Sequence, residues 1–172
     1  VPERAPKEGV LIEPEFLDEG VLSVPTAALQ QVRLEVARVG GIAVDMLRDL
    51  GPALQDGDQT RLEEIARRDD QIDILEAEIF KYLGRILERM LTEQESARFQ
   101  GLMTATDNIE NLADIVETDI LVLARKVADI SASSGEETRL MFMELYTTIV
   151  NSVQLAVDAV RDNDQRAAES VL

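Results

Sequence analysis

The chain has 172 residues, a formal net charge of −17 and neither histidine nor cysteine. The excess of acid disfavours direct binding to nucleic acids and to anionic lipids, because both recruit proteins through clusters of Lys and Arg. Without His or Cys, the chain has no disulfides, thiolate chemistry, Ser-His-Asp catalysis or typical zinc site.

Residues 1–25 hold four of the five prolines together with several charges and no helical periodicity, so they predict an extended leader. From residue 26 onward the sequence is rich in Ala, Leu, Glu, Arg, Val and Ile and poor in Gly, Pro and aromatic residues. This composition is typical of an all-α domain. We therefore expect a helical bundle over residues 26–172.

Apolar residues recur every three or four positions in four long segments, which predicts long helices that are antiparallel to their neighbours because the connections are short. Capping boxes at Thr60, Thr92 and Ser134 begin three of these helices. Pro52 is expected to kink or end the first. The expected helices span about residues 26–55, 60–91, 93–131 and 135–170. The predicted core includes Leu62, Ile65, Ile72, Ile79, Ile109, Val116, Ile120 and Leu123.

No stretch approaches the roughly 18 to 20 consecutive apolar residues expected of a membrane span. Residues 1–25 carry acids where a secretory signal peptide would be basic and then apolar. We therefore expect a soluble fragment that does not itself insert into lipid. Its opening valine favours a domain cut from a longer protein.

The segment RRDDQIDILEAEIFKYL, residues 67–83, places two acids, Asp69 and Glu76, on the apolar seam of the second expected helix. A buried carboxylate needs a partner or a raised pKa. Arg67, Arg68 or an arginine of another helix is one kind of partner, and a metal ion is the other.

Two pairs of acids with a spacing of four residues are candidate metal ligands: Asp69 with Asp73, and Glu110 with Asp114. This spacing places both acids of a pair on one helix face, close enough to share a cation. The second and third helices are expected to fold back near residue 92, so Asp73 and Asp114 should lie at similar heights. With 34 acids in the chain, such spacings also arise by chance, and a solvated acidic face is the alternative.

These segments resemble the signatures of a known family. RRDDQIDILEAEIFKYL resembles the second-helix signature of PhoU domains, and DNIENLADIVETDI, residues 107–120, resembles their third-helix signature. The segment EPEFLDEGVLSVPTAALQQVRLEVARV is similar to the sequence after the last membrane helix of bacterial sodium/phosphate cotransporters. The resemblance spans about residues 13–165.

The resemblance implies that the metal-associated acids of the family fall on Asp69, Asp73, Glu110 and Asp114. From the negative charge of the chain and its oxygen donors, we expect a divalent or trivalent metal: Mg, Mn, Fe or Zn. It also implies a cytoplasmic regulatory domain of a sodium-dependent phosphate transporter. The domain would be attached to the transmembrane portion of the same polypeptide and lie at the cytoplasmic face of the inner membrane. Asn108, Asn111 and Ala113 depart from the usual Asp, Arg and Gly of the family. The chain holds the acidic pairs of only one repeat, half the usual number, so we do not expect a multinuclear metal cluster.

The fold implied is a PhoU-like three-helix repeat followed by a fourth helix that lacks the rest of its own repeat. Such a helix would pack on its own bundle or exchange with a second copy, and we expect a homodimer.

Two other classes of function are compatible with the sequence. One is a free-standing PhoU-like adaptor that regulates phosphate uptake and signalling. The other is a carboxylate metalloenzyme, either a hydrolase or an oxygen-activating bundle. Since the chain has no histidine and no nucleophile beside a base, we expect it not to be an enzyme.

Overall fold

A computed structural model describes residues 12–133 and 135–164, with all side chains in these ranges except those of residues 120, 121, 123–133 and 139. The described chain is helical and contains no strand, so the all-α prediction is confirmed. A 3-10 helix, η1 (Glu19–Val21), precedes the α-helices α1 (Pro25–Asp56), α2 (Gln59–Ala66), α3 (Asp69–Ile86), α4 (Glu93–Ser133) and α5 (Glu136–Asp162).

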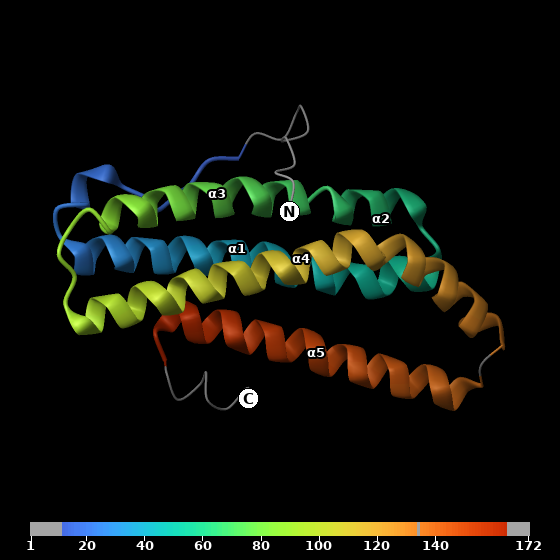
Figure 1. Ribbon diagram of the computed structural model, residues 1–172. Helices are drawn as coiled ribbons and strands as arrows, with labels where there is room; N and C mark the ends of the chain where they lie inside the picture. Colours follow the sequence, from blue (N-terminus) through green and yellow to red (C-terminus); the bar gives the residue numbers. More distant parts are fainter. Residues whose placement is uncertain (1–11, 134, 165–172) are drawn as a thin grey trace.

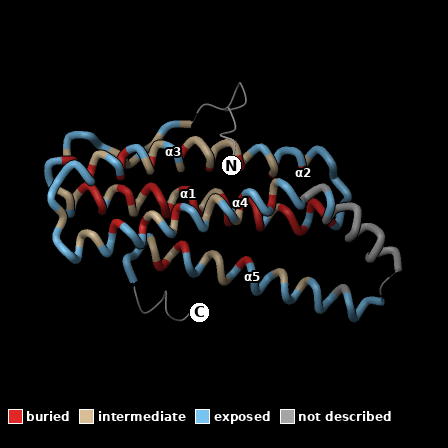
Figure 2. The backbone as a smooth tube through the Cα atoms, viewed as in Figure 1, coloured by how far each residue is buried: buried red, intermediate tan, exposed pale blue. Residues whose placement is uncertain are grey.

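Helix α1 is the centre of the bundle. It packs against α2, α3, α4 and α5, whereas α3 and α4 also pack against each other. In Figure 1, α2 and α3 follow one another along α1, with α4 beside them and α5 on the far side of α4 from α3. Consequently α1 is buried along most of its length, whereas much of α5 is exposed (Figure 2).

The apolar seams predicted from the sequence form the core. Ile109 is partly buried against this core, and the side chains of Ile120 and Leu123 lie outside the described part of the chain. The remaining predicted core residues are buried: Leu62, Ile65, Ile72, Ile79 and Val116.

The second helix is interrupted. The expectation of one helix over residues 60–91 is wrong, because the chain forms two helices, α2 and α3, joined by a tight turn at Arg67 and Arg68. The amide of Arg68 donates to the carbonyl of Ile65, three residues back rather than the four of an α-helix (3.0 Å). The apolar seam continues across this turn, so hydrophobic spacing does not reveal it. As a result Asp69 is the first residue of α3, which ends at Ile86.

Two of the expected capping boxes can be compared with the structure. The box at Thr92 is confirmed, since the amide of Glu95 donates to the Thr92 hydroxyl (3.2 Å) and the amide of Thr92 to the Glu95 carboxylate (2.9 Å). The prediction of a capping box at Thr60 is wrong. Asp58 caps α2 instead, because its side chain accepts a hydrogen bond from a backbone N–H in the first turn (3.1 Å). Ser134 lies outside the described residues.

Helix α1 continues through Pro52, and α5 packs on it at this point. The Tyr146 hydroxyl accepts a hydrogen bond from the amide of Gly51 (2.8 Å) and donates to a carbonyl one turn earlier in α1. A Cβ atom at Gly51 would lie 2.7 Å from the Tyr146 ring, and one at Gly40 would lie 2.7 Å from Val157. The two glycines thus allow α5 to approach closely, and within the chain α5 packs on its own bundle.

The described part of the leader is bound to the bundle by polar contacts. The Glu35 carboxylate, which is fully buried, accepts hydrogen bonds from the amides of Glu15 and Phe16 (2.8 Å each) and from Arg38 (2.6 Å). The Tyr82 hydroxyl donates to a leader carbonyl (2.6 Å). These bonds hold the leader against α1 and α3.

Among the described helices, only α5 is long and apolar enough to cross a membrane, judged by length and composition alone. Its 18-residue window of highest mean hydropathy reaches 1.3. The expectation that no segment approaches a membrane span is therefore wrong by this measure. Uncharged polar residues such as Thr147 and Asn151 interrupt the apolar run, so a count of consecutive apolar residues misses it. A helix packed on a protein core passes the same test, and α5 packs on α1.

Candidate metal centre

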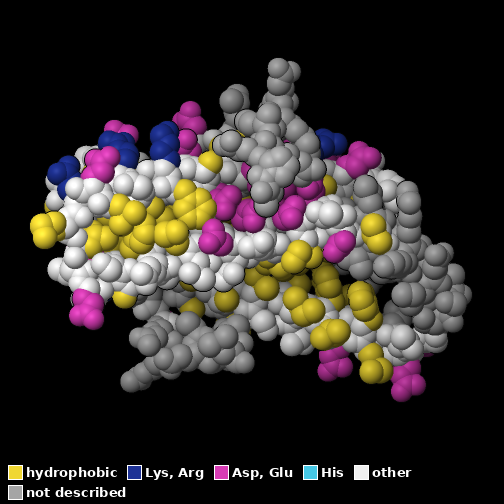
Figure 3. All heavy atoms as spheres, viewed as in Figure 1, with side chains coloured by type: hydrophobic (Ala, Val, Ile, Leu, Met, Phe, Trp, Pro, Cys, Tyr) yellow, Lys and Arg dark blue, Asp and Glu magenta, His cyan; other side chains and the backbone are white. Residues whose placement is uncertain are grey.

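Acidic side chains gather midway along the face where α3 and α4 meet (Figure 3). The two helices are antiparallel neighbours, so carboxylates far apart in the sequence come close together across their contact. These carboxylates form two groups, one after the other along the contact.

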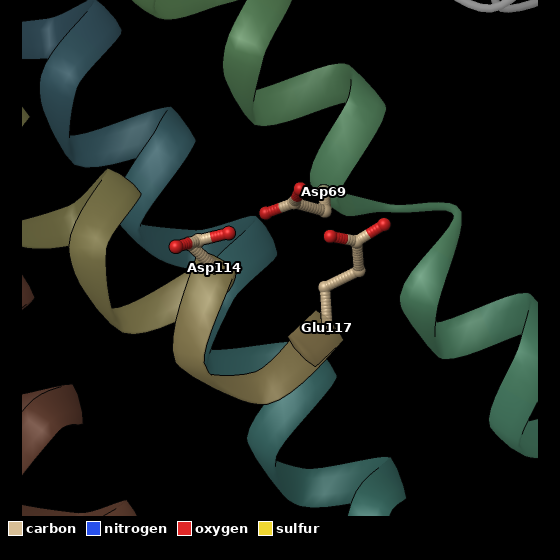
Figure 4. Close-up of side chains that lie close together, drawn as sticks. All are labelled: Asp69, Asp114 and Glu117. Atoms are coloured by element: carbon tan, nitrogen blue, oxygen red, sulfur yellow. The ribbon is translucent and has the colours of Figure 1, made fainter. Parts of the chain in front are cut away.

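The first group consists of Asp69, Asp114 and Glu117 (Figure 4). Asp69 comes from the first turn of α3, and the other two come from one turn of α4. One carboxylate oxygen of each residue lies within 4.8 Å of the others. Three such oxygens are close enough to bind one cation.

The second group consists of Asp73, Glu76 and Glu110, with one oxygen of each again within 4.8 Å of the others. Asp73 follows Asp69 by one turn of α3, and Glu110 precedes Asp114 by one turn of α4. The two groups are therefore adjacent along the helix pair, and all three members of the second are partly buried.

The four acids proposed from the sequence all lie in this cluster, but their pairing differs from the expected one. Asp69 faces Asp114, and Asp73 faces Glu110, so the expected match in height between Asp73 and Asp114 is wrong by about one helical turn. Asp73 lies 19 residues before position 92 and Asp114 lies 22 after it, and this difference of three residues is almost a full helical turn.

Two further candidate ligands, Glu76 and Glu117, did not belong to the proposed set. Glu76 stood on the apolar seam of its helix, which was a usable signal. Glu117 follows Asp114 by three residues, a spacing that also places two side chains on one helix face. Glu117 has no acid four residues away on either side, so a spacing of four does not indicate it.

Within the described part of the chain, Asp69 has no arginine partner, which was one of the two alternatives for a buried carboxylate here. Its side chain is 4 % exposed, and its Oδ1 atom is buried without a hydrogen-bond partner. Arg67 instead pairs with Glu63 (3.7 Å), and Arg68 pairs with Asp49 (2.7 Å). A buried, unpartnered carboxylate oxygen is costly, and a cation bound among these carboxylates would offset that cost.

The electrostatics of the cluster oppose full ionisation in the absence of a cation. Burial, and then repulsion from Asp73 and the other acids, raises the pKa of Asp69 to about 7. Burial and the nearby Glu110 raise the pKa of Glu76 to about 7 as well. Burial and Asp114 also raise the pKa of Glu110 itself. Asp49, by contrast, has a lowered pKa because Arg68 donates a hydrogen bond to it.

The position of Asp69 in its helix partly offsets the cost of burying its negative charge. It lies in the first turn of α3, where the unpaired backbone N–H groups and the helix dipole favour negative charge, typically by 0.3–1 kcal/mol. This contribution is too small to offset the burial of a carboxylate beside several others, whereas a divalent cation would neutralise several charges at once.

The donor set indicates which cations would fit. All six side chains offer carboxylate oxygens and none offers nitrogen or sulfur, so hard cations such as Mg²⁺ and Mn²⁺ fit better than Zn²⁺. Mg²⁺ in particular is usually bound through one or two carboxylates and keeps several waters, which suits groups at a partly exposed helix contact.

The family model of the PhoU domain matches residues 36–118. Curated relatives are the proteins described as "Putative inorganic phosphate export protein YjbB" from Escherichia coli O157:H7 and Escherichia coli strain K12, each 26% identical over 167 residues, or 95% of this chain. The protein of the same description from Salmonella typhimurium is 26% identical over 157 residues, or 91% of the chain. No solved structure shows a significant match.

The chain spans about 30% of the length of the E. coli relatives and 29% of the Salmonella protein. The segment that matches the family runs from Val36 in α1 to Thr118 in α4, so it contains both acidic groups and the turn that places Asp69 at the start of α3. Residues 36–118 of this chain are therefore similar to the PhoU domain family.

Proposed function

We propose that the chain is the regulatory PhoU domain of a phosphate-transport protein, and that its two acidic groups bind divalent cations that stabilise the bundle. The observation that carries the proposal is the buried Oδ1 atom of Asp69, which has no hydrogen-bond partner and belongs to a group with Asp114 and Glu117. Cation binding there would link the stability of the α3–α4 contact to the supply of metal.

The connection to transport is supported by the relatives. They are named for phosphate export, and the chain corresponds to about 30% of their length. In the protein we propose, the domain is joined to a transmembrane, sodium-dependent transporter portion and lies at the cytoplasmic face of the membrane. Its acidic surface would bind basic cytoplasmic loops and shift the transporter between active and restrained states.

A free-standing adaptor that regulates phosphate uptake is the second candidate, because the PhoU match over residues 36–118 supports it equally. The coding sequence upstream of Val1 distinguishes the two. Paired hydrophobic repeats there would support attachment to a transporter, and an isolated start codon would support the adaptor.

Phosphate flux in cells tests the regulatory role. Cells that produce the full-length protein with Asp69→Asn and Glu110→Gln should retain sodium-driven phosphate flux but lose its adjustment to external phosphate. The matched control is Glu88→Gln, which neutralises an exposed acid outside both groups. An unchanged phosphate response in the double variant would contradict the proposal.

A further inference from the structure

Helix α5 exposes an apolar face that no other part of the described chain covers. Although α4 and α5 are consecutive, they make almost no contact with each other, because each packs separately against α1. Hydrophobic side chains gather over α5 and between α5 and α4 (Figure 3). We call this surface the α5 face, and its exposed apolar residues are Leu140, Met141, Phe142, Leu145, Ile149 and Leu155.

The α5 face is large for a monomer. Its residues are 45% to 67% exposed, which corresponds to on the order of 600 Å² of surface, at the upper end of the roughly 300–600 Å² of the largest patch on a typical monomer. A standard protein–protein interface buries about 800 Å² on each partner. The face is therefore close to the size that a stable dimer needs.

Charge restricts what can approach this surface. Between Met141 and Ala156, Glu144 is the only charged residue in the sequence of α5. The chain as a whole carries −17, and the α3–α4 contact is lined with acids. Two copies of the chain would repel each other in most orientations. The repulsion would be weakest when their α5 faces meet.

The face is also suited to pair with itself. Ile149 is the central residue of α5 (Glu136–Asp162), and the exposed residues Met141, Leu145 and Ile149 follow at steps of four, as on one side of a helix. A two-fold axis near Ile149 would place α5 of one copy antiparallel to α5 of the other, so that each stripe covers the other.

We propose that the α5 face binds a second copy of this chain, giving a two-fold dimer in which the α5 helices pack antiparallel about Ile149. A membrane is the less suitable occupant. The net charge repels anionic lipids, and burial of α5 in a bilayer would break its contacts with α1 through Tyr146 and Val157. The dimer does not depend on the proposed cation binding.

Sedimentation velocity of the whole chain tests this inference. The parent should be a dimer at micromolar concentration. The affinity of the two copies for each other should increase as salt screens their repulsion. Leu145→Glu combined with Ile149→Glu should weaken the dimer at least tenfold without changing the helical circular dichroism. The control is Leu87→Glu combined with Met90→Glu, which adds the same two charges at residues that are 57% and 97% exposed and outside the α5 face.

A cross-linking experiment tests the position of the axis. The chain contains no cysteine, so Ile149→Cys would carry the sole thiol. Under oxidising conditions it should form a disulfide-linked dimer, whereas Met90→Cys should remain largely unlinked. The inference is overturned if the parent is monomeric at all concentrations, or if the double variant remains as dimeric as the parent. Co-sedimentation of the parent with phosphatidylglycerol vesicles that is lost in the double variant would also overturn it, in favour of a membrane.

Discussion

Glu35 and Asp69 are both buried carboxylates in the same bundle, with 0% and 4% of the residue exposed, but their surroundings are opposite. Glu35 accepts two backbone N–H groups of the leader and pairs with Arg38. Asp69 has an oxygen without a hydrogen-bond partner and is surrounded by other acids. Burial alone therefore does not identify a ligand site.

The difference shows what a buried acid contributes in each case. Where the fold supplies donors, as at Glu35, the carboxylate joins two segments of chain and stabilises the structure. Where the fold supplies further carboxylates, as at Asp69, the group should lower stability, and a bound cation should relieve the repulsion. The first region should depend on its carboxylate for folding, and the second should gain stability when its carboxylate is removed.

The largest expected effect is at Glu35. Glu35→Ala leaves two leader amides and Arg38 without their acceptor, and breaking a buried pair in this way costs about 3–5 kcal/mol of unfolding free energy. Urea denaturation monitored by circular dichroism would measure the loss. Glu88→Ala, at an exposed position, should change stability little. A loss below about 1 kcal/mol at Glu35 would remove the contrast between the two acids.

Metal should produce the next largest effect. A cation that binds only the folded chain adds about 2.7 kcal/mol at a hundredfold excess over its Kd. For a chain of this size, the melting temperature should rise by roughly 5–10 °C with Mg²⁺ or Mn²⁺. Asp69→Asn combined with Glu110→Gln should abolish this rise. Glu35→Ala should melt at a lower temperature but keep the rise. A rise that persists in the double variant would place metal binding elsewhere.

In the absence of metal, neutralising Asp69 should stabilise the protein. Asp69→Asn removes one charge from a group of like charges, and the relief should be about 1–2 kcal/mol, opposite in sign to the effect at Glu35. Thermal unfolding in the presence of a chelator measures it. Destabilisation of similar size would mean that Asp69 has a partner which the variant leaves unpaired.

The smallest expected effect is a dependence on pH. The pKa of Asp69 is raised to about 7 in the folded chain from 3.8 in the unfolded chain, so between these values the folded chain binds more protons. Its stability relative to Asp69→Asn should therefore fall as pH rises through about 4 to 7 and level off above. From pH 6 to 8, the advantage of Asp69→Asn should grow by about 1 kcal/mol. Chemical denaturation at both pH values would show this, and an advantage independent of pH would contradict the raised pKa.

The bundle could be predicted from the sequence because each long helix has apolar residues at every third or fourth position. The apolar seam of α1 and the capping box at Thr92 depend only on residues that are close together in the sequence, so both could be predicted without knowing the tertiary contacts. The turn at Arg67 and Arg68 was missed because it leaves the apolar seam in phase. The candidate site was predicted in part for the same reason, since Asp69 and Glu76 visibly interrupt an apolar stripe.

What the sequence could not predict depends on tertiary contacts. The register between α3 and α4 decides that Asp69 faces Asp114 and not Glu110, and a shift of one turn changes every pairing. The role of Glu35 could not be predicted from the sequence. Its donors are the amides of Glu15 and Phe16, about twenty residues away in an irregular segment. Periodicity does not report such contacts.

Calorimetric titration of the metal-free chain with Mn²⁺ at pH 7.5 tests the central claim most directly. The parent should bind Mn²⁺ with saturable heat and release protons, because carboxyls with raised pKa values must ionise to act as ligands. Glu88→Gln should behave like the parent, and Asp69→Asn should lose the tightest binding. If Asp69→Asn binds Mn²⁺ with the same affinity, stoichiometry and proton release as the parent, the acidic groups between α3 and α4 are not the metal centre.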